Sequence, residues 1–210
     1  MKLFFLGVPG AGKGTQAEII SAKLGIPAIS TGAIIREAVE KQTQMGIKAE
    51  AHMKDGTLVP DEVVIGIIKE RLAQKDCAKG FILDGFPRTL PQGRALLEMG
   101  VEADHVIVIE VPDEIIEERM MGRRVCPKCA ATYHTRFQPP RDGKNCDSCD
   151  VKLTIRNDDE PKTVRNRLAI YHEQTEPLKG FYEDLGKCVV LDGTQEIETV
   201  TAQILRIIGK

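Results

Sequence analysis

A glycine-rich segment near the amino terminus has the spacing of a phosphate-binding loop. Residues 7–15 (GVPGAGKGT) follow a short apolar run and place Lys13 directly after the second of two suitably spaced glycines. Such a loop points backbone N–H groups at an anion, and the following helix adds its positive end. Lys13 would reach the β- and γ-phosphates of ATP, and Thr15 would offer a hydroxyl to Mg²⁺. One detail departs from the general pattern, because Gly14 separates Lys13 from the hydroxyl residue.

A second polar segment follows another apolar run. Residues 80–83 are apolar and lead into Asp84-Gly85-Phe86-Pro87-Arg88. An acid at the carboxyl end of a parallel strand lies beside the phosphate loop, where it can orient Mg²⁺ through water. The planar fork of Arg88 suits a phosphate or a carboxylate. Taken alone, the segment could equally be a capped turn followed by a solvated charge, but beside a phosphate loop it favours a functional role.

Four cysteines form two Cys-x-x-Cys pairs separated by sixteen residues: Cys126, Cys129, Cys146 and Cys149. This spacing is typical of a tetrahedral structural zinc site. Free thiols and disulfides are the alternatives; disulfides are disfavoured because the sequence shows no export segment and cytosolic thiols stay reduced. His134 could replace one ligand, although we expect it to be an ordinary side chain. A closed site of four cysteines leaves no open position for catalysis, so the metal would stiffen the segment.

Apolar runs alternate with helical patterns along the rest of the chain. This alternation predicts an α/β fold with a five-stranded parallel sheet flanked by helices on both sides. Residues 31–59 and 122–159 interrupt the alternation and are interpreted as insertions at the edge of the sheet. The expected strands are residues 2–6, 27–29, 80–83, 105–111 and 188–191, and the expected helices are residues 15–24, 61–74, 91–99, 112–122, 163–185 and 197–208.

The motifs occur in the order found in the adenylate kinase family, and the chain resembles that family over nearly its whole length. The resemblance rests on residues 7–15, 30–36, 84–92, 118–124 and 156–167. It implies a P-loop kinase that transfers the γ-phosphoryl group of ATP reversibly to AMP, giving two ADP. The implied domains are a core (1–29, 60–121 and 160–210), an AMP-binding insertion (30–59) and a mobile lid (122–159). Some members of the family carry zinc at the four cysteine positions.

The resemblance also implies roles for individual residues. The catalytic set is Lys13, Asp84, Arg88, Arg123, Arg156 and Arg167. Contacts to ATP are implied for Gly10, Ala11, Gly12, Lys13, Gly14, Thr15, Arg119, Arg123, Thr132, Tyr133 and Gln195. Contacts to AMP are implied for Thr31, Arg36, Thr57, Leu58, Val59, Gly85, Phe86, Pro87, Arg88, Gln92, Arg156 and Arg167. The family usually has Asp after Ser-Thr-Gly, whereas this chain has Ala33, so that carboxylate's hydrogen bonds are absent.

The charge and composition limit the remaining alternatives. The net charge is -2, and the chain has no Trp and only three Tyr, which argues against a nucleic-acid-binding protein. A P-loop factor with a zinc ribbon that binds nucleic acid is therefore the weaker alternative, and a related UMP or CMP kinase is the stronger one. No apolar run approaches the ~20 residues that span a bilayer. We expect a cytoplasmic monomer whose partners are ATP, AMP and ADP, with no membrane and no nucleic acid.

Overall fold

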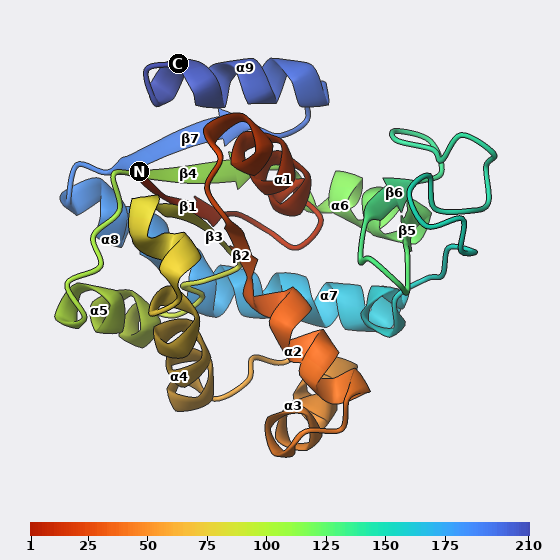
Figure 1. The fold of residues 1–210 in the computed structure, drawn as a ribbon, viewed down its shortest axis with the longest axis horizontal. Helices are drawn as coiled ribbons and strands as arrows, with labels where there is room; N and C mark the ends of the chain where they lie inside the picture. The colour runs from red at the N-terminus through yellow and green to blue at the C-terminus, as the bar shows by residue number, and fades with distance from the viewer.

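Five short strands form a parallel sheet at the centre of the molecule. The computed structural model describes residues 1–210, and the strands lie in the order β2-β3-β1-β4-β7 (Figure 1). The predicted α/β fold with a five-stranded parallel sheet is confirmed, and the observed strands differ from the expected ones by one residue at some ends. The strands are β1 (Lys2–Leu6), β2 (Ala28–Ser30), β3 (Phe81–Asp84), β4 (His105–Glu110) and β7 (Cys188–Asp192).

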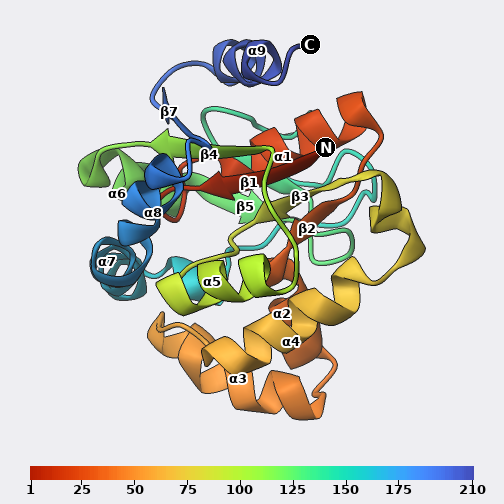
Figure 2. The ribbon, with the colours of Figure 1, turned by 90° about the vertical axis from the view of Figure 1, so that its left-hand side faces the viewer.

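Helices cover both faces of this sheet, because its central strands are apolar on both sides. Leu3 and Phe5 of β1 are buried in one cluster, and Phe4 and Leu6 are buried in the other. The first face is covered by α1 (Lys13–Leu24) and α9 (Ile197–Ile207) (Figure 2). The second face is covered by α4 (Asp61–Leu72), α5 (Leu90–Glu98) and α8 (Pro177–Asp184).

Two helices, α2 (Thr31–Glu40) and α3 (Gln44–Asp55), occupy the first of the expected insertions and project beyond the sheet (Figure 1). Ser30 and Thr43 cap the two helices through side-chain hydroxyls that accept backbone N–H groups. Gly46 allows the helices to approach, because a Cβ at this position would collide with the backbone of Ala38.

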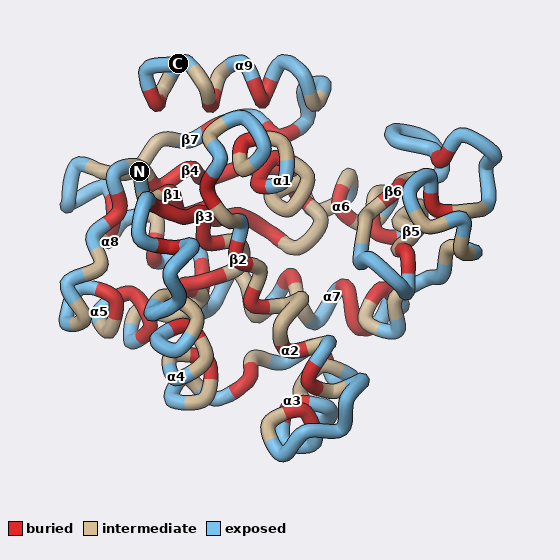
Figure 3. Tube along the Cα trace, viewed as in Figure 1, coloured by how far each residue is buried: buried red, intermediate tan, exposed pale blue.

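Residues 122–159, named here the lid segment, have little regular structure. They contain the antiparallel pair β5 (Arg123–Val125) and β6 (Thr132–His134) and the short 3-10 helix η2 (Asn157–Asp159). Buried residues are few in this segment and dense in the sheet (Figure 3). The chain enters the segment from α6 (Asp113–Gly122) and leaves it into α7 (Pro161–Ile170).

One predicted helix was wrong in its extent. The sequence pattern indicated a continuous helix over residues 163–185, whereas the structure has α7, a π-helical turn η3 (Tyr171–Thr175) and then α8. Tyr171 and Glu176 keep helical backbone angles, so the helical path continues through η3, and this π-turn precedes Pro177, which has no N–H to donate to the preceding turn. A further 3-10 helix, η1 (Lys75–Lys79), precedes β3. No helix has both the length and the apolar character required to cross a membrane.

Candidate active site

The glycine-rich loop joins the end of β1 to the start of α1. Gly7, Gly10 and Gly12 have positive φ angles of 136°, 87° and 97°, a region that other residues rarely adopt. Gly12 precedes α1, and no side chain caps the helix there. The free N–H groups and the positive end of α1 therefore remain available to an anion.

The Lys13 ammonium is partly buried at this loop. It donates to the carbonyl oxygens of Gly7 and Val8 at 2.7 and 2.8 Å. Burial lowers the pKa of Lys13 to about 7; Asp84 opposes this shift, and the positive charge of Arg88 adds to it. The site thus holds a cation that a bound polyphosphate would stabilise.

Asp84 lies next to this loop at the carboxyl end of β3. It pairs in register with Phe5 of β1, and its Oδ2 lies 3.5 Å from where a Cβ on Gly14 would stand. Thr15 and Asp84 line the same cleft, so an oxygen-coordinated Mg²⁺ with ATP fits the donors present.

Five arginines from different elements converge on one cleft of about 1090 Å³, together with Lys13. Two of them are paired with carboxylates: Arg123 with Asp159, and Arg167 with Asp158 at 3.0 Å. These pairs hold the two guanidinium groups in position inside the cleft. The five are Arg36, Arg88, Arg123, Arg156 and Arg167.

The other three arginines have no carboxylate partner. Arg88 donates through Nε to the carbonyl oxygen of Gly85 at 2.8 Å, and Arg36 and Arg156 form no ion pair. Burial, followed by the charge of Arg123, lowers the pKa of Arg156 to about 9. Burial also lowers the pKa values of Arg36 and Arg88. Three partly buried arginines without carboxylate partners define a place for phosphate groups.

The AMP side of the cleft, as expected from the resemblance, is formed by α2, α5 and the turn after β3. The buried Thr31 donates its hydroxyl to Gly85 O at 2.8 Å, and Gln92 is buried beside Arg88. Thr57, Leu58, Val59 and Pro87 also line the cleft. Phe86 does not line it, because its side chain is fully buried in the core under the sheet. Any contact from Phe86 to a nucleotide would have to come from its backbone.

At the opposite end, Arg119 faces the residues expected to contact ATP. Its guanidinium donates to Gly193 O at 2.8 Å and lies 5.8 Å from the centre of the Phe137 ring. Thr132, Tyr133 and Gln195 line this end, as do Gly10, Ala11, Gly12 and Gly14 of the loop. An aromatic ring and a guanidinium facing each other provide stacking surfaces for a base.

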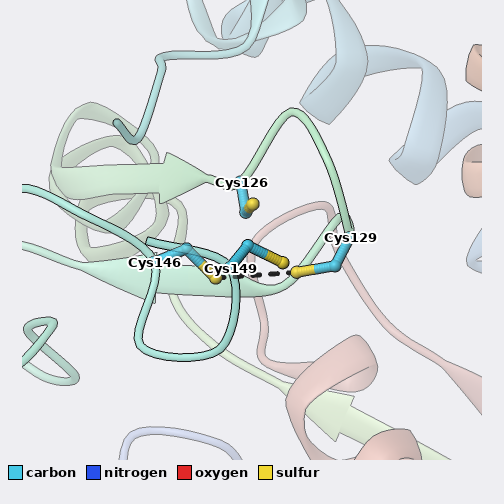
Figure 4. A group of neighbouring side chains, drawn as sticks. All are labelled: Cys126, Cys129, Cys146 and Cys149. Atoms are coloured by element: carbon cyan, nitrogen blue, oxygen red, sulfur yellow. Dashed lines mark hydrogen bonds between the residues drawn. The ribbon is translucent and has the colours of Figure 1, made fainter. Parts of the chain in front are cut away.

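The four cysteine thiols form one cluster within the lid segment (Figure 4). All four Sγ atoms lie within 4.8 Å of one another, and those of Cys129 and Cys146 are 3.6 Å apart. A tetrahedral zinc ion with Zn–S bonds of about 2.3 Å requires sulfur atoms roughly 3.8 Å apart, so the thiols fit the metal. The two thiols of Cys126 and Cys146 are buried.

Comparison with known proteins agrees with this arrangement. The profile of the family described as Adenylate kinase matches residues 5–187. The chain is 50% identical over 213 residues to "Adenylate kinase" of Lachnospira eligens, with 100% of both chains covered. It is 52% identical over 214 residues to the protein of the same name from Carboxydothermus hydrogenoformans, covering 100% of both. The Archaeoglobus fulgidus protein of that name is also 52% identical over 214 residues, covering 100% of this chain and 99% of the relative.

This chain belongs to the adenylate kinase family. The predicted family and the predicted adenylate kinase function are thereby confirmed, and the UMP/CMP kinase and nucleic-acid alternatives are not favoured. Adenylate kinases are nucleoside monophosphate kinases, a class of phosphotransferase that uses Mg²⁺ with ATP.

The cleft also contains residues to which the sequence analysis gave no place in it. His134 and Phe137 lie against each other with ring centres 4.5 Å apart, and both line the cleft. His134 Nδ1 accepts the backbone N–H groups of Arg136 and Phe137, at 3.0 and 3.1 Å, and is not part of the cysteine cluster. The Cys-x₄-His spacing carried no hint of this role. Arg71 and Arg136 also line the cleft, but Asp76 and Glu118 neutralise them.

Tyr133 lines the cleft and also contacts the cysteine cluster. Its hydroxyl lies 3.4 Å from Cys146 Sγ and accepts the N–H of Asp147 at 2.9 Å. The ring is buried between the cysteine turns. The side chain therefore supports the cluster, and contact with a nucleotide is left to the backbone of this strand.

Proposed function

We propose that this chain transfers the γ-phosphoryl group of ATP to AMP and back, with one nucleotide at each end of the cleft. The observation that carries the proposal is the set of partly buried, unpaired cations between the two ends: Arg36, Arg88 and Arg156. Two nucleotides bring about six negative charges before Mg²⁺ binds, and positive groups placed between them stabilise the transferring phosphoryl group.

The position of each residue along the cleft indicates which nucleotide group it binds. The loop with Lys13 holds the ATP phosphates, and Arg119 lies against the ATP base. Arg36 and Arg88 hold the AMP phosphate, while Arg123, Arg156 and Arg167 surround the transferred group. Thr15 and Asp84 would hold Mg²⁺, which adds positive charge between the phosphates when it is bound.

The lid segment would act as a hinged cover over this reaction. We assign residues 122–159 to a lid, residues 30–59 to AMP binding, and residues 1–29, 60–121 and 160–210 to the core. Structural Zn²⁺ at the four cysteines would make the lid a rigid unit. Closing such a lid keeps water from the γ-phosphate and so limits hydrolysis. The protein is expected to be a cytoplasmic monomer that does not bind nucleic acid.

An assay with several acceptors tests the proposal. The protein is mixed with ATP, Mg²⁺ and either AMP, CMP, UMP or GMP, and the diphosphates are separated by chromatography. We expect two ADP for each AMP consumed and far lower rates with the other acceptors. Release of inorganic phosphate without ADP formation from AMP would contradict the proposal, as would calorimetry that found only one nucleotide site. Native mass spectrometry of freshly purified protein should show one zinc ion.

A further inference from the structure

The side-chain amide of Gln92 is held at both of its polar atoms. Gln92 is only 2% exposed and lines the cleft on the expected AMP side. Its Oε1 accepts the backbone N–H of Arg88 at 2.7 Å, and its Nε2 donates to Asp61 Oδ1 at 2.7 Å. Both hydrogen bonds are short, so the amide has one defined orientation.

Neither the Arg88 N–H nor the Asp61 carboxylate can switch between donating and accepting a hydrogen bond. A backbone N–H only donates, and an ionised carboxylate only accepts. If the amide turned end for end, Nε2 would face the Arg88 N–H and Oε1 would face the Asp61 carboxylate. Both hydrogen bonds would then be replaced by repulsive contacts in a buried place.

Asp61 is itself well anchored. It is the first residue of α4, where the positive end of the helix favours a carboxylate. Its Oδ1 also accepts the hydroxyl of Thr89 at 3.0 Å, and Thr89 caps α5, the helix that carries Gln92. Asp61 does not line the cleft, so it acts through Gln92.

The two bonds leave Gln92 one N–H donor and one oxygen lone pair for a ligand. Adenine offers the complementary pair, an N6 amino donor beside a ring-nitrogen acceptor. Hypoxanthine, the base of IMP, reverses the pair at this edge, with an O6 acceptor beside an N1–H donor. Only a flipped amide could bind the reversed pair.

We propose that Asp61 is a positioning residue that sets the base selectivity of the acceptor site by preventing rotation of the Gln92 amide. The proposal rests on the proposed function and takes the contact between Gln92 and AMP that the resemblance implies to be a contact with the base. The substitution Asp61→Asn removes the fixed acceptor, since an amide at position 61 can donate as readily as it accepts.

The test compares kcat/KM for AMP and for IMP, with ATP and Mg²⁺, in the wild type, Asp61→Asn and Glu62→Gln. Glu62 is the matched control, because it is an exposed acid in the same first turn of α4 and does not contact Gln92. We expect the ratio of IMP to AMP to rise about tenfold in Asp61→Asn and to stay unchanged in Glu62→Gln.

If the IMP-to-AMP ratio of kcat/KM were unchanged in Asp61→Asn, the proposal would be overturned, even if both values fell. A purely structural role would lower kcat/KM for both substrates by the same factor. Thermal melting shows whether the variant folds. If it does not, Asp61→Ala removes the same acceptor and should raise the ratio likewise. A wild type that makes no ADP from AMP would instead contradict the proposed function, so the two failures are distinguishable.

Discussion

The parallel sheet and the lid segment differ in how much apolar surface each of them buries. The two faces of the sheet are covered by clusters of 19 and 18 buried apolar residues. The cluster in the lid segment has three, Cys126, Tyr133 and Cys146, and two of these are thiols of the proposed metal site. The sheet can therefore be stabilised by burial alone, whereas the lid segment depends on a crosslink.

The two regions also hold charge differently. Lys13 and Arg88 are partly buried beside the sheet without a carboxylate partner. At the base of the lid segment, Arg123 pairs with Asp159, so the ion pair joins the two ends of that segment. The cations beside the sheet are therefore left for a ligand's charge, whereas in the lid segment Arg123 is neutralised and Arg156 stays unpaired.

The largest expected effect follows from removing one thiol. Cys146→Ser should lose the zinc and unfold residues 122–159 locally, because little apolar burial remains there, while the sheet stays folded. Metal analysis and hydrogen exchange by mass spectrometry measure both regions at once. Cys77→Ser, at a buried thiol outside the cluster, should keep the zinc. If the lid segment kept its protection from hydrogen exchange after losing the metal, it would not depend on the crosslink.

The unpaired charge beside the sheet should matter for catalysis and little for folding. Arg88→Lys keeps the positive charge but loses the planar fork, and we expect kcat to fall about a thousandfold, as with arginine-finger losses. Steady-state kinetics measure this, with the exposed Arg94→Lys as the control. A loss below about tenfold would count against the assignment, and the zinc content should not change.

A core substitution should affect the sheet and spare the metal site. Phe4 is 1% exposed and packs edge-on against Tyr182 with ring centres 6.0 Å apart. Phe4→Ala should lower the free energy of unfolding by about 3–5 kcal/mol while the zinc stoichiometry is unchanged. Urea denaturation measures the loss, and Phe137→Ala, at a side chain that is 49% exposed, should cost far less. Equal losses in the free energy of unfolding for Phe4→Ala and Phe137→Ala would show that apolar burial does not distinguish the sheet from the lid segment.

The lowered pKa of Lys13 predicts a pH dependence of ATP binding. Burial lowers its pKa to about 7, so the free protein loses this proton above pH 7, and bound phosphate should restore it. ATP affinity should weaken by up to about tenfold per pH unit above 7, with proton uptake on binding. Burying the charged Lys13 lowers the free energy of unfolding, whereas a lysine with an ion-pair partner would raise it. This destabilisation is fully present below pH 7 and disappears as the pH approaches 10.5.

Calorimetry of ATP binding at pH 8, in two buffers of different ionisation enthalpy, counts the protons taken up. Lys13→Arg should take up none, because a guanidinium keeps its charge at this pH. Equal proton uptake in the wild type and in Lys13→Arg would mean that a group other than Lys13 takes up the proton.

The smallest expected effect concerns the support of the cysteine cluster. Tyr133→Phe removes the hydroxyl beside Cys146 and should weaken zinc binding about tenfold. Competition with a chromogenic chelator measures the affinity. Tyr171→Phe is the matched control, because Tyr171 lies in η3 and not in the cysteine cluster. Equal zinc affinities in the two variants would mean that the thiols alone hold the metal.

Much of the site could be predicted because its signals are local. The phosphate loop needs glycines and a lysine within nine consecutive residues, and the cysteine pairs need only short turns. The roles of the other arginines came from resemblance to a family. Nothing local distinguished Arg123 and Arg167, which are paired, from Arg36 and Arg156, which are not.

The features that the sequence pattern did not specify have physical causes of the same kind. The helix expected over residues 163–185 contains the π-helical turn η3, since an apolar period does not reveal where the backbone hydrogen bonding changes ahead of Pro177. Phe86 was expected in the nucleotide pocket, but its ring is buried under the sheet, so its part in the site is limited to the backbone. His134 and Phe137 contact the cleft through a short turn whose direction the residue types do not specify.

By itself, the sequence determined the order of strands and helices, the phosphate loop and the cysteine spacing, because each depends on neighbouring residues and on apolar periodicity. Only the tertiary structure decided which charges are neutralised and how Gln92 is oriented. Asp61, Thr89 and Gln92 meet across a separation of 28 to 31 residues. Such contacts depend on how the helices pack on the sheet, and no local pattern encodes that geometry.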